Sequence, residues 1–172
     1  MLMDKKNDNS FFAMLSRMKY IERWALMRNS LRENVSEHSL ETAVVAHALA
    51  IIGNCRLGMD YDIEYIALLA MYHDCTEIIT GDMPTPVKYY NTEIKDAYKE
   101  IEVNAAKNLL SRLPEDMALE YEKYLLPKED ASVMKLIKAA DKISALIKCI
   151  EEEKTGNREF NHAKESTFKA IR

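Results

Sequence analysis

Two histidines and two aspartates, spread over about a hundred positions, have side chains of the kinds that bind metal ions. They are His38, the adjacent pair His73 and Asp74, and Asp141. Two imidazoles and two carboxylates form a mixed nitrogen and oxygen set, which suits one divalent metal with coordination positions left open. Each of the four lies at a position where the helical pattern calls for an apolar residue or for no particular residue type. Together they predict a mononuclear metal site.

Helices must position these four residues, because the chain has few residues that interrupt helices. Only four Gly and four Pro occur, β-hairpin signals are absent, and apolar residues recur at intervals of three and four. The sequence therefore predicts an all-α, single-domain protein. The expected helices span residues 11–20, 35–53, 62–79, 91–112, 115–125, 131–153 and 159–171.

The helix expected over 35–53 contains two histidines that cannot share one ion. Asn34 and Glu37 have the spacing of a capping box, which puts His38 in the first turn. His47 lies nine residues further on, about 900° of rotation at 100° per residue, and so on the opposite face. We therefore expect His38 to be a ligand and His47 to be structural.

The pair His73 and Asp74 comes directly after the apolar run 66–71 and Tyr72. Neighbouring residues in a helix point about 100° apart, so both can reach one ion only from beside the helix axis. Glu77 lies one turn after His73, on the same side. An alternative is a polar helix face with ordinary side-chain pairs, because the dipeptide alone is a weak signal.

Asp141 projects close to an apolar stripe, four residues after Ile137 and seven after Met134. A carboxylate in that position is costly unless it is paired or bound to a metal. The alternative to a metal ligand is a surface ion pair with Lys138 or Lys142, which contributes little stability.

One segment, Thr80 to Pro86, is dense in residues that interrupt helices. Gly81 is placed to end the helix that begins near Asp62, and the two prolines stiffen the residues after that glycine. A well-ordered helix connection is the simple interpretation. The position of the segment, a few residues after His73 and Asp74, favours a functional loop.

The composition limits the classes of partner. A net charge of −4 over 172 residues argues against nucleic-acid polymers and leaves small anionic ligands open. Three cysteines without a CxxC pair fit a reducing compartment. The N-terminus, residues 1–10, has no apolar signal core, and the longest apolar run, 43–52, is too short to span a bilayer. We expect a cytoplasmic protein without a membrane partner.

The order H…HD…D on three helices resembles the HD-domain metal-dependent phosphohydrolase superfamily. From about residue 11 to residue 160 the chain is similar to the bacterial 5′-deoxynucleotidases of that superfamily. The stretches that carry this likeness are residues 23–29, 33–39, 72–77 and 80–88. Their Arg-Trp and Gly-Asp-x-Pro-Thr-Pro elements are specific, whereas the HD pair alone is not. The resemblance implies a single HD domain over 1–172 with the architecture of a helical bundle.

The resemblance implies hydrolysis of 2′-deoxyribonucleoside 5′-monophosphates to the deoxynucleoside and inorganic phosphate. It also implies one divalent transition metal, typically Mn²⁺ or Co²⁺, and a homodimer. The implied metal ligands are His38, His73, Asp74 and Asp141. Such an ion polarises a phosphoryl oxygen and orients or ionises a water, which this very slow reaction requires. Glu77, with Asp74 beside it, is the expected catalytic carboxylate that holds or deprotonates the water.

The same resemblance implies a set of substrate contacts. Arg23, and with it Lys88, neutralises the phosphate, and Trp24 walls the sugar and excludes a 2′-hydroxyl. The remaining implied substrate-binding residues are His38, Asp74, Asp82, Met83, Pro84, Thr85 and Asp141. No base-reading element is evident, so we expect several bases to be accepted.

Two alternatives remain open at this point. The same fold and metal could serve nucleoside triphosphates or another phosphate ester, although the short list of basic residues, Arg23, Arg28 and Lys88, argues against extra phosphates. A nucleotide-sensing module without turnover has no chemical need for Glu77. A dinuclear site is not expected, because His47 faces away and His162 lies far along the chain.

The chain stops within an apparent helical pattern, whereas family members usually continue. A truncation or a natural deletion would explain this difference.

Overall fold

The computed structural model describes residues 10–128 and 131–171, and every regular element in this part of the chain is a helix. This confirms the all-α, single-domain prediction. The α-helices are α1 (Phe11–Leu15), α2 (Val35–Leu57), α3 (Ile63–Tyr72), α4 (Glu77–Thr80), α5 (Thr85–Lys88), α6 (Thr92–Leu110), α7 (Glu115–Leu125), α8 (Ala131–Lys154) and α9 (Asn161–Ile171). Two 3₁₀ turns, η1 (Ser16–Tyr20) and η2 (Arg158–Phe160), complete the described elements.

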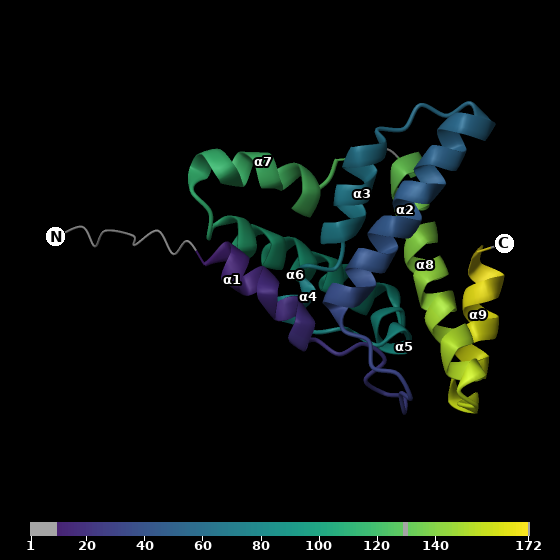
Figure 1. The fold of residues 1–172 in the computed structure, drawn as a ribbon. Coiled ribbons are helices and arrows are strands. Elements are labelled where there is room, and N and C mark those ends of the chain that lie inside the picture. Colours follow the sequence, from purple (N-terminus) through teal and green to yellow (C-terminus); the bar gives the residue numbers. More distant parts are fainter. Residues whose placement is uncertain (1–9, 129–130, 172) are drawn as a thin grey trace.

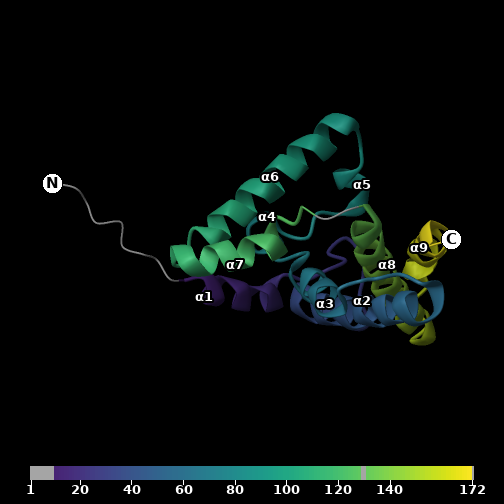
Figure 2. The same cartoon turned by 90° about the horizontal axis from the view of Figure 1, so that it is seen from above.

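The helices form two groups that meet near the N-terminal end of α2. In one group α2 lies between α3 and α8, and α9 packs against α8 (Figure 1). In the other, α1, α6 and α7 pack together beside α3 (Figure 2). The chain therefore brings the start of α2, the end of α3 and the middle of α8 to one place.

Small residues allow α2, α3 and α8 to approach closely. Their shared core is rich in alanine and contains Ala43, Ala46, Ala50, Ile66, Leu69, Ala70, Ile137 and Ala140. Side chains of this size let helix backbones approach one another, because little volume separates the axes. Ala140 lies directly before Asp141, and Ala70 lies three residues before His73, so this core sets the spacing of the site.

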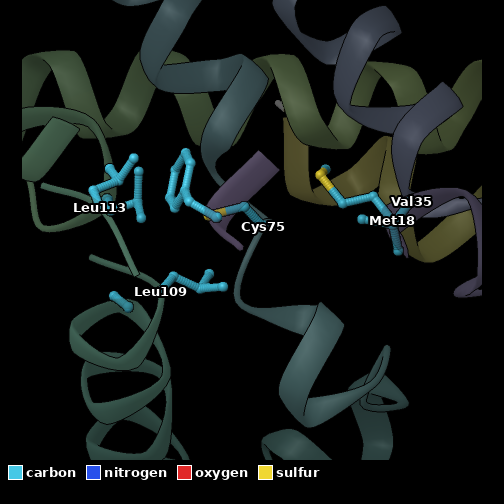
Figure 3. Close-up of a cluster of buried hydrophobic side chains, with 8 residues drawn as sticks. Met18, Val35, Cys75, Leu109 and Leu113 are labelled. Carbon is cyan, nitrogen blue, oxygen red and sulfur yellow. The ribbon is translucent and has the colours of Figure 1, made fainter. Parts of the chain in front are cut away.

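A second core joins the two groups of helices. Its buried members are Phe11, Met18, Val35, Cys75, Ala106, Leu109, Leu113 and Leu125. Figure 3 shows Cys75 between the Leu109 and Leu113 side and the Met18 and Val35 side. Because Cys75 is buried immediately after Asp74, packing here fixes the turn that carries the aspartate.

Helix α2 begins with the predicted capping box. The Asn34 side chain accepts a hydrogen bond from the backbone N–H of Glu37, whose carboxylate accepts one from the N–H of Asn34. The helix continues four residues beyond the expected end and stops at Gly58, where φ is +65°. By length and composition alone α2 is able to cross a membrane, but a core helix passes the same test. Its contacts with α3 and α8 are those of a core helix.

The expected helix over 62–79 is wrong, because the chain breaks at the functional pair. Helix α3 ends at Tyr72, residues 73–76 form a turn, and Gly81 ends only the short helix α4. The Cys75 N–H donates to the Tyr72 carbonyl, a bond three residues back rather than four. Apolar periodicity does not register so short a break, and the turn lets both side chains face one point.

Smaller differences occur elsewhere. The expected helices over 11–20 and 159–171 each divide into a 3₁₀ turn and an α-helix, at η1 and η2. The breaker-rich segment contains the short helix α5, which begins after Pro84 and includes Pro86 in its first turn. Proline lacks the N–H that this first turn leaves unbonded, so it is tolerated there.

Candidate metal centre and substrate cavity

The four predicted ligand side chains converge. His38 Nε2 on α2 lies 3.0 Å from Asp141 Oδ1 on α8 and 3.7 Å from Asp74 Oδ2. His73 Nε2 lies 3.1 Å from the same Asp74 oxygen and 4.0 Å from Asp141 Oδ1. Among the described residues, His38, His73 and Asp74 offer ligand atoms that all lie within 4.8 Å of one another.

The histidine ring orientations fit a metal ion. His73 Nδ1 donates to the Ala70 carbonyl at 2.7 Å, which leaves its Nε2 lone pair inside the cluster. That Nε2 is buried and has no hydrogen-bond partner. His38 directs Nδ1 toward Ser144 Oγ, 3.2 Å away, so its Nε2 also faces the carboxylates. Two imidazoles held in this way and two carboxylates form a donor set for one divalent cation.

The electrostatics of the cluster favour positive charge. Burial alone would lower the pKa of His38, but the nearby carboxylates of Asp141 and Glu33 outweigh it and raise that pKa to about 9. Burial would raise the pKa of Asp74, yet the neighbouring His73 holds it well below its usual range. The carboxylates thus stabilise a cation at this position.

Glu77 lies on the short helix α4, beside the candidate metal ligand Asp74. Its side chain is 7% exposed, and its Oε2 has no hydrogen-bond partner. Burial, followed by the charges of Asp74 and Asp82, raises the pKa of Glu77 to about 9. A buried carboxyl group with a free oxygen next to a cation site is suited to general acid–base chemistry.

Arg23 and Trp24 lie on the segment that leads from η1 toward α2. Arg23 Nη1 is 3.4 Å from Asp74 Oδ2, which places the guanidinium beside the candidate metal ligands. The Trp24 backbone has φ of +60°, and its N–H donates to Asp82 Oδ2 at 3.2 Å. Its indole lies 5.3 Å from the buried ring of Phe160, measured between centroids. The structure therefore holds Trp24 through both its backbone and its ring.

One cavity of about 850 Å³ connects these residues, a size typical of small-molecule sites. The predicted site residues on its wall are Arg23, Trp24, Asp74, Glu77, Asp82, Met83, Pro84, Thr85, Lys88 and Asp141. His38 and His73 lie behind this wall, where their ring nitrogens meet the aspartates.

The charged side chains of the cavity wall differ from the prediction in two respects. Lys88 lines the wall as expected, but its ammonium binds Glu102 at 2.8 Å, so its charge is already neutralised. Lys138 and Lys142 on α8 were not predicted to face a substrate, yet both line the cavity. Lys138 and Lys142 therefore add positive charge to the cavity wall, whereas the charge of Lys88 is offset by Glu102.

His162 also lies on the cavity wall, although its distance along the chain led us to expect a remote position. Helix α9 folds back against α8 and carries this histidine to the cavity. No signal in the local sequence predicts that return.

The expected opposition of His38 and His47 is present. His38 is fully buried, whereas His47 is exposed on the other side of α2.

An all-helical bundle that gathers an H…HD…D set beside one cavity defines an HD-domain phosphohydrolase. A solved HD-domain phosphohydrolase from Listeria innocua, lin2634, has this fold, with a TM-score of 0.81 and 26% identity over 92% of this chain and 77% of that chain. More specifically, the family model described as 5′-deoxynucleotidase YfbR-like matches residues 10–172, and the chain belongs to this family.

Two relatives illustrate the extent of the similarity. The 5′-deoxynucleotidase VP0926 of Vibrio parahaemolyticus is 53% identical over 161 residues, covering 91% of this chain and 81% of the relative. The 5′-deoxynucleotidase ECA3034 of Pectobacterium atrosepticum is 49% identical over 170 residues, covering 96% and 83%.

Proposed function

We propose that this protein hydrolyses 2′-deoxyribonucleoside 5′-monophosphates to the deoxynucleoside and inorganic phosphate. The observation that carries the proposal is the convergence of four ligand side chains beside Glu77 and Arg23 on one cavity. About half of the residues are identical to those of enzymes named 5′-deoxynucleotidases. Water supplies the oxygen that joins phosphorus, the bond from phosphorus to the 5′ oxygen breaks, and that oxygen takes a proton.

His38, His73, Asp74 and Asp141 would hold one divalent transition metal. When bound, such an ion acts as a Lewis acid on phosphoryl oxygen and lowers the pKa of water. The orphaned Nε2 of His73 and the negative charge around it support this assignment. Mn²⁺ or Co²⁺ is the proposed identity.

The chain's own residues supply binding and proton transfer. Arg23 neutralises the phosphate, because its guanidinium lies beside Asp74 and offers paired N–H donors. Glu77 positions the attacking water. Burial and the negative charges of Asp74 and Asp82 raise its pKa. Once a bound cation offsets those charges, Glu77 is ionised and accepts the proton of that water. Lys88 is paired with Glu102, whereas Arg23 is paired with Asp74 inside the cluster of candidate metal ligands, so we assign phosphate binding chiefly to Arg23.

The sugar would lie between Trp24 and the segment Asp82 to Thr85, which face the same cavity. In this arrangement the indole ring would exclude a 2′-hydroxyl, and the loop would contact the sugar and phosphate from the other side.

Phosphate release from a panel of nucleotides, with Mn²⁺, Co²⁺ or a chelator, tests this function. We expect metal-dependent turnover of dAMP, dGMP, dCMP and dTMP, and much slower turnover of AMP. The panel includes dATP because Lys138 and Lys142 add positive charge to the cavity wall. Equal rates on AMP and dAMP would contradict the deoxynucleotidase assignment, while leaving a metal-dependent phosphohydrolase.

We also propose a cytoplasmic homodimer without nucleic-acid or membrane partners. The outer face of α2 supports a self-association surface, because Leu40, Val44, Ile51 and Ile52 are exposed at helical spacing. Sedimentation of the wild type and of Val44→Glu tests this, with a shift of the variant to monomer as the expected result.

A further inference from the structure

Glu33 contacts three predicted site residues, although its own role was not predicted. Its side chain is 7% exposed and lies directly before the N-cap of α2. Oε2 accepts a hydrogen bond from Trp24 Nε1 at 2.6 Å and lies 3.6 Å from Arg23 Nε. Oε1 lies 3.3 Å from His38 Nδ1. One carboxylate thus stands between the indole, the guanidinium and a metal ligand.

The backbone around Glu33 explains how one side chain reaches all three. The Arg23 N–H donates to the Glu33 carbonyl at 2.9 Å, and the Val35 N–H donates to the Ile21 carbonyl at 2.9 Å. These bonds lay the segment carrying Arg23 and Trp24 antiparallel to the residues that lead into α2, with one isolated bridge between Glu22 and Asn34.

The three contacts differ in how easily they are replaced. His38 Nδ1 has a second neighbour, because Ser144 Oγ lies 3.2 Å away. The indole N–H of Trp24 donates to Glu33, and Phe160 supports the ring but offers no side-chain acceptor. Losing the carboxylate leaves a partly buried donor unpaired and frees the ring to rotate.

We propose that Glu33 is a positioning residue that couples sugar selection to the metal centre. It holds the Trp24 indole where the ring excludes a 2′-hydroxyl, and it holds His38 with Nε2 directed at the ion. This inference rests on the proposed function, because selectivity has meaning only for a nucleotidase. It adds a role for a residue that touches neither substrate nor metal.

Two substitutions at Glu33 separate the two contacts. Glu33→Ala removes both, so we expect the preference for dAMP over AMP to fall at least about tenfold. Metal affinity should fall about tenfold, the low end of the usual range for a supporting contact, because Ser144 Oγ remains beside His38 Nδ1. Glu33→Gln retains one acceptor oxygen for the indole but presents an N–H donor to His38. The Glu33→Gln variant should therefore keep most of the preference for dAMP over AMP but bind the metal more weakly. Glu22→Gln, an exposed neighbour, is the matched control and should change neither.

The measurements are the ratio of kcat/KM for dAMP and AMP, and Co²⁺ affinity from visible absorption, which does not depend on turnover. In the Trp24→Ala background, Glu33→Ala should change selectivity no further, because it acts through the ring. Wild-type selectivity and Co²⁺ affinity in folded Glu33→Ala protein would overturn the proposal. Wild-type protein that hydrolyses no deoxynucleotide would instead refute the proposed function, and a loss of Co²⁺ affinity in Glu33→Gln would still support the contact with His38.

Discussion

His38 Nε2 and Asp141 Oδ1 lie 3.0 Å apart although 103 positions separate them in the chain. The contact joins the first turn of α2 to the middle of α8, two helices that pack along an alanine-rich seam. Among the described residues, the Asp141 carboxylate has ion-pair contacts with His38 and His73 only.

Metal content should depend on both residues of this pair. We expect His38→Ala and Asp141→Ala each to lose bound metal while helix content persists, because three remaining ligands define the site poorly. Metal analysis of the purified proteins and circular dichroism check this. His47→Ala is the control and should retain its metal. Full metal content in Asp141→Ala would exclude Asp141 from the site.

Glu77→Gln should separate turnover from binding. The proposed base would be lost, so kcat for dAMP should fall about 10²- to 10⁴-fold. Metal content and dAMP binding, measured by calorimetry, should stay near the wild-type values. A rate close to that of the wild type would contradict the catalytic role, and a loss of metal would make Glu77 a ligand or its support.

Sugar selectivity should reside in Trp24, and phosphate binding in Arg23. Trp24→Ala should narrow the difference between dAMP and AMP chiefly by admitting AMP. Arg23→Ala should lower kcat/KM on deoxynucleotides as well, because misplacing the phosphate by about 1 Å costs on the order of 10²-fold in rate. Steady-state kinetics on both nucleotides distinguish these effects. Unchanged discrimination in Trp24→Ala would remove the ring from sugar recognition.

Low pH should weaken the hydrogen bonds by which Glu152 holds the loop between Trp24 and α2. Glu152 is fully buried and accepts hydrogen bonds from Lys148, Asn157 and the backbone N–H groups of Ser30 and Leu31. Burial would raise its pKa, but these bonds outweigh it and lower the pKa from 4.5 to about 2.

The direction of the pH dependence is set by that difference. The folded state favours the ionised form, so its stabilisation is complete above pH 4.5 and is lost as pH falls through about 2. Urea unfolding should show that Glu152→Gln lowers stability at pH 6, with a smaller difference from the wild type at pH 3. Glu153→Gln, its exposed neighbour, should have little effect at either pH. A constant difference for Glu152→Gln across this range would contradict the linkage.

The sequence predicted the individual helices better than it predicted which helices pack against one another. The capping box placed the start of α2 at the observed residue, because Asn34 and Glu37 act locally. The break after Tyr72 was missed, because His73 bonds the Ala70 carbonyl through its side chain and apolar spacing carries no trace of that bond.

The candidate site could be predicted only in part, because local sequence does not show long-range contacts. Residue types and order singled out His38, His73, Asp74 and Asp141, and the structure brings these four side chains together. Glu33 was overlooked because its partners become visible only when residues 21–24 pair with 33–35. His162 was misplaced because distance along the chain does not reveal that α9 folds back onto α8.

The positive φ of Trp24 has a consequence for engineering. At +60° an L side chain costs roughly 1–2 kcal/mol relative to glycine, and Trp24 is the one described non-glycine residue in this region. Trp24→Ala would remove the ring yet keep that strain, whereas Trp24→Gly would remove both. The difference in stability between these two variants equals the strain minus the free-energy cost of the larger conformational entropy of glycine in the unfolded chain. Because Trp24 is the proposed barrier to a 2′-hydroxyl, glycine is the least strained starting point for redesigning this enzyme to accept ribonucleotides.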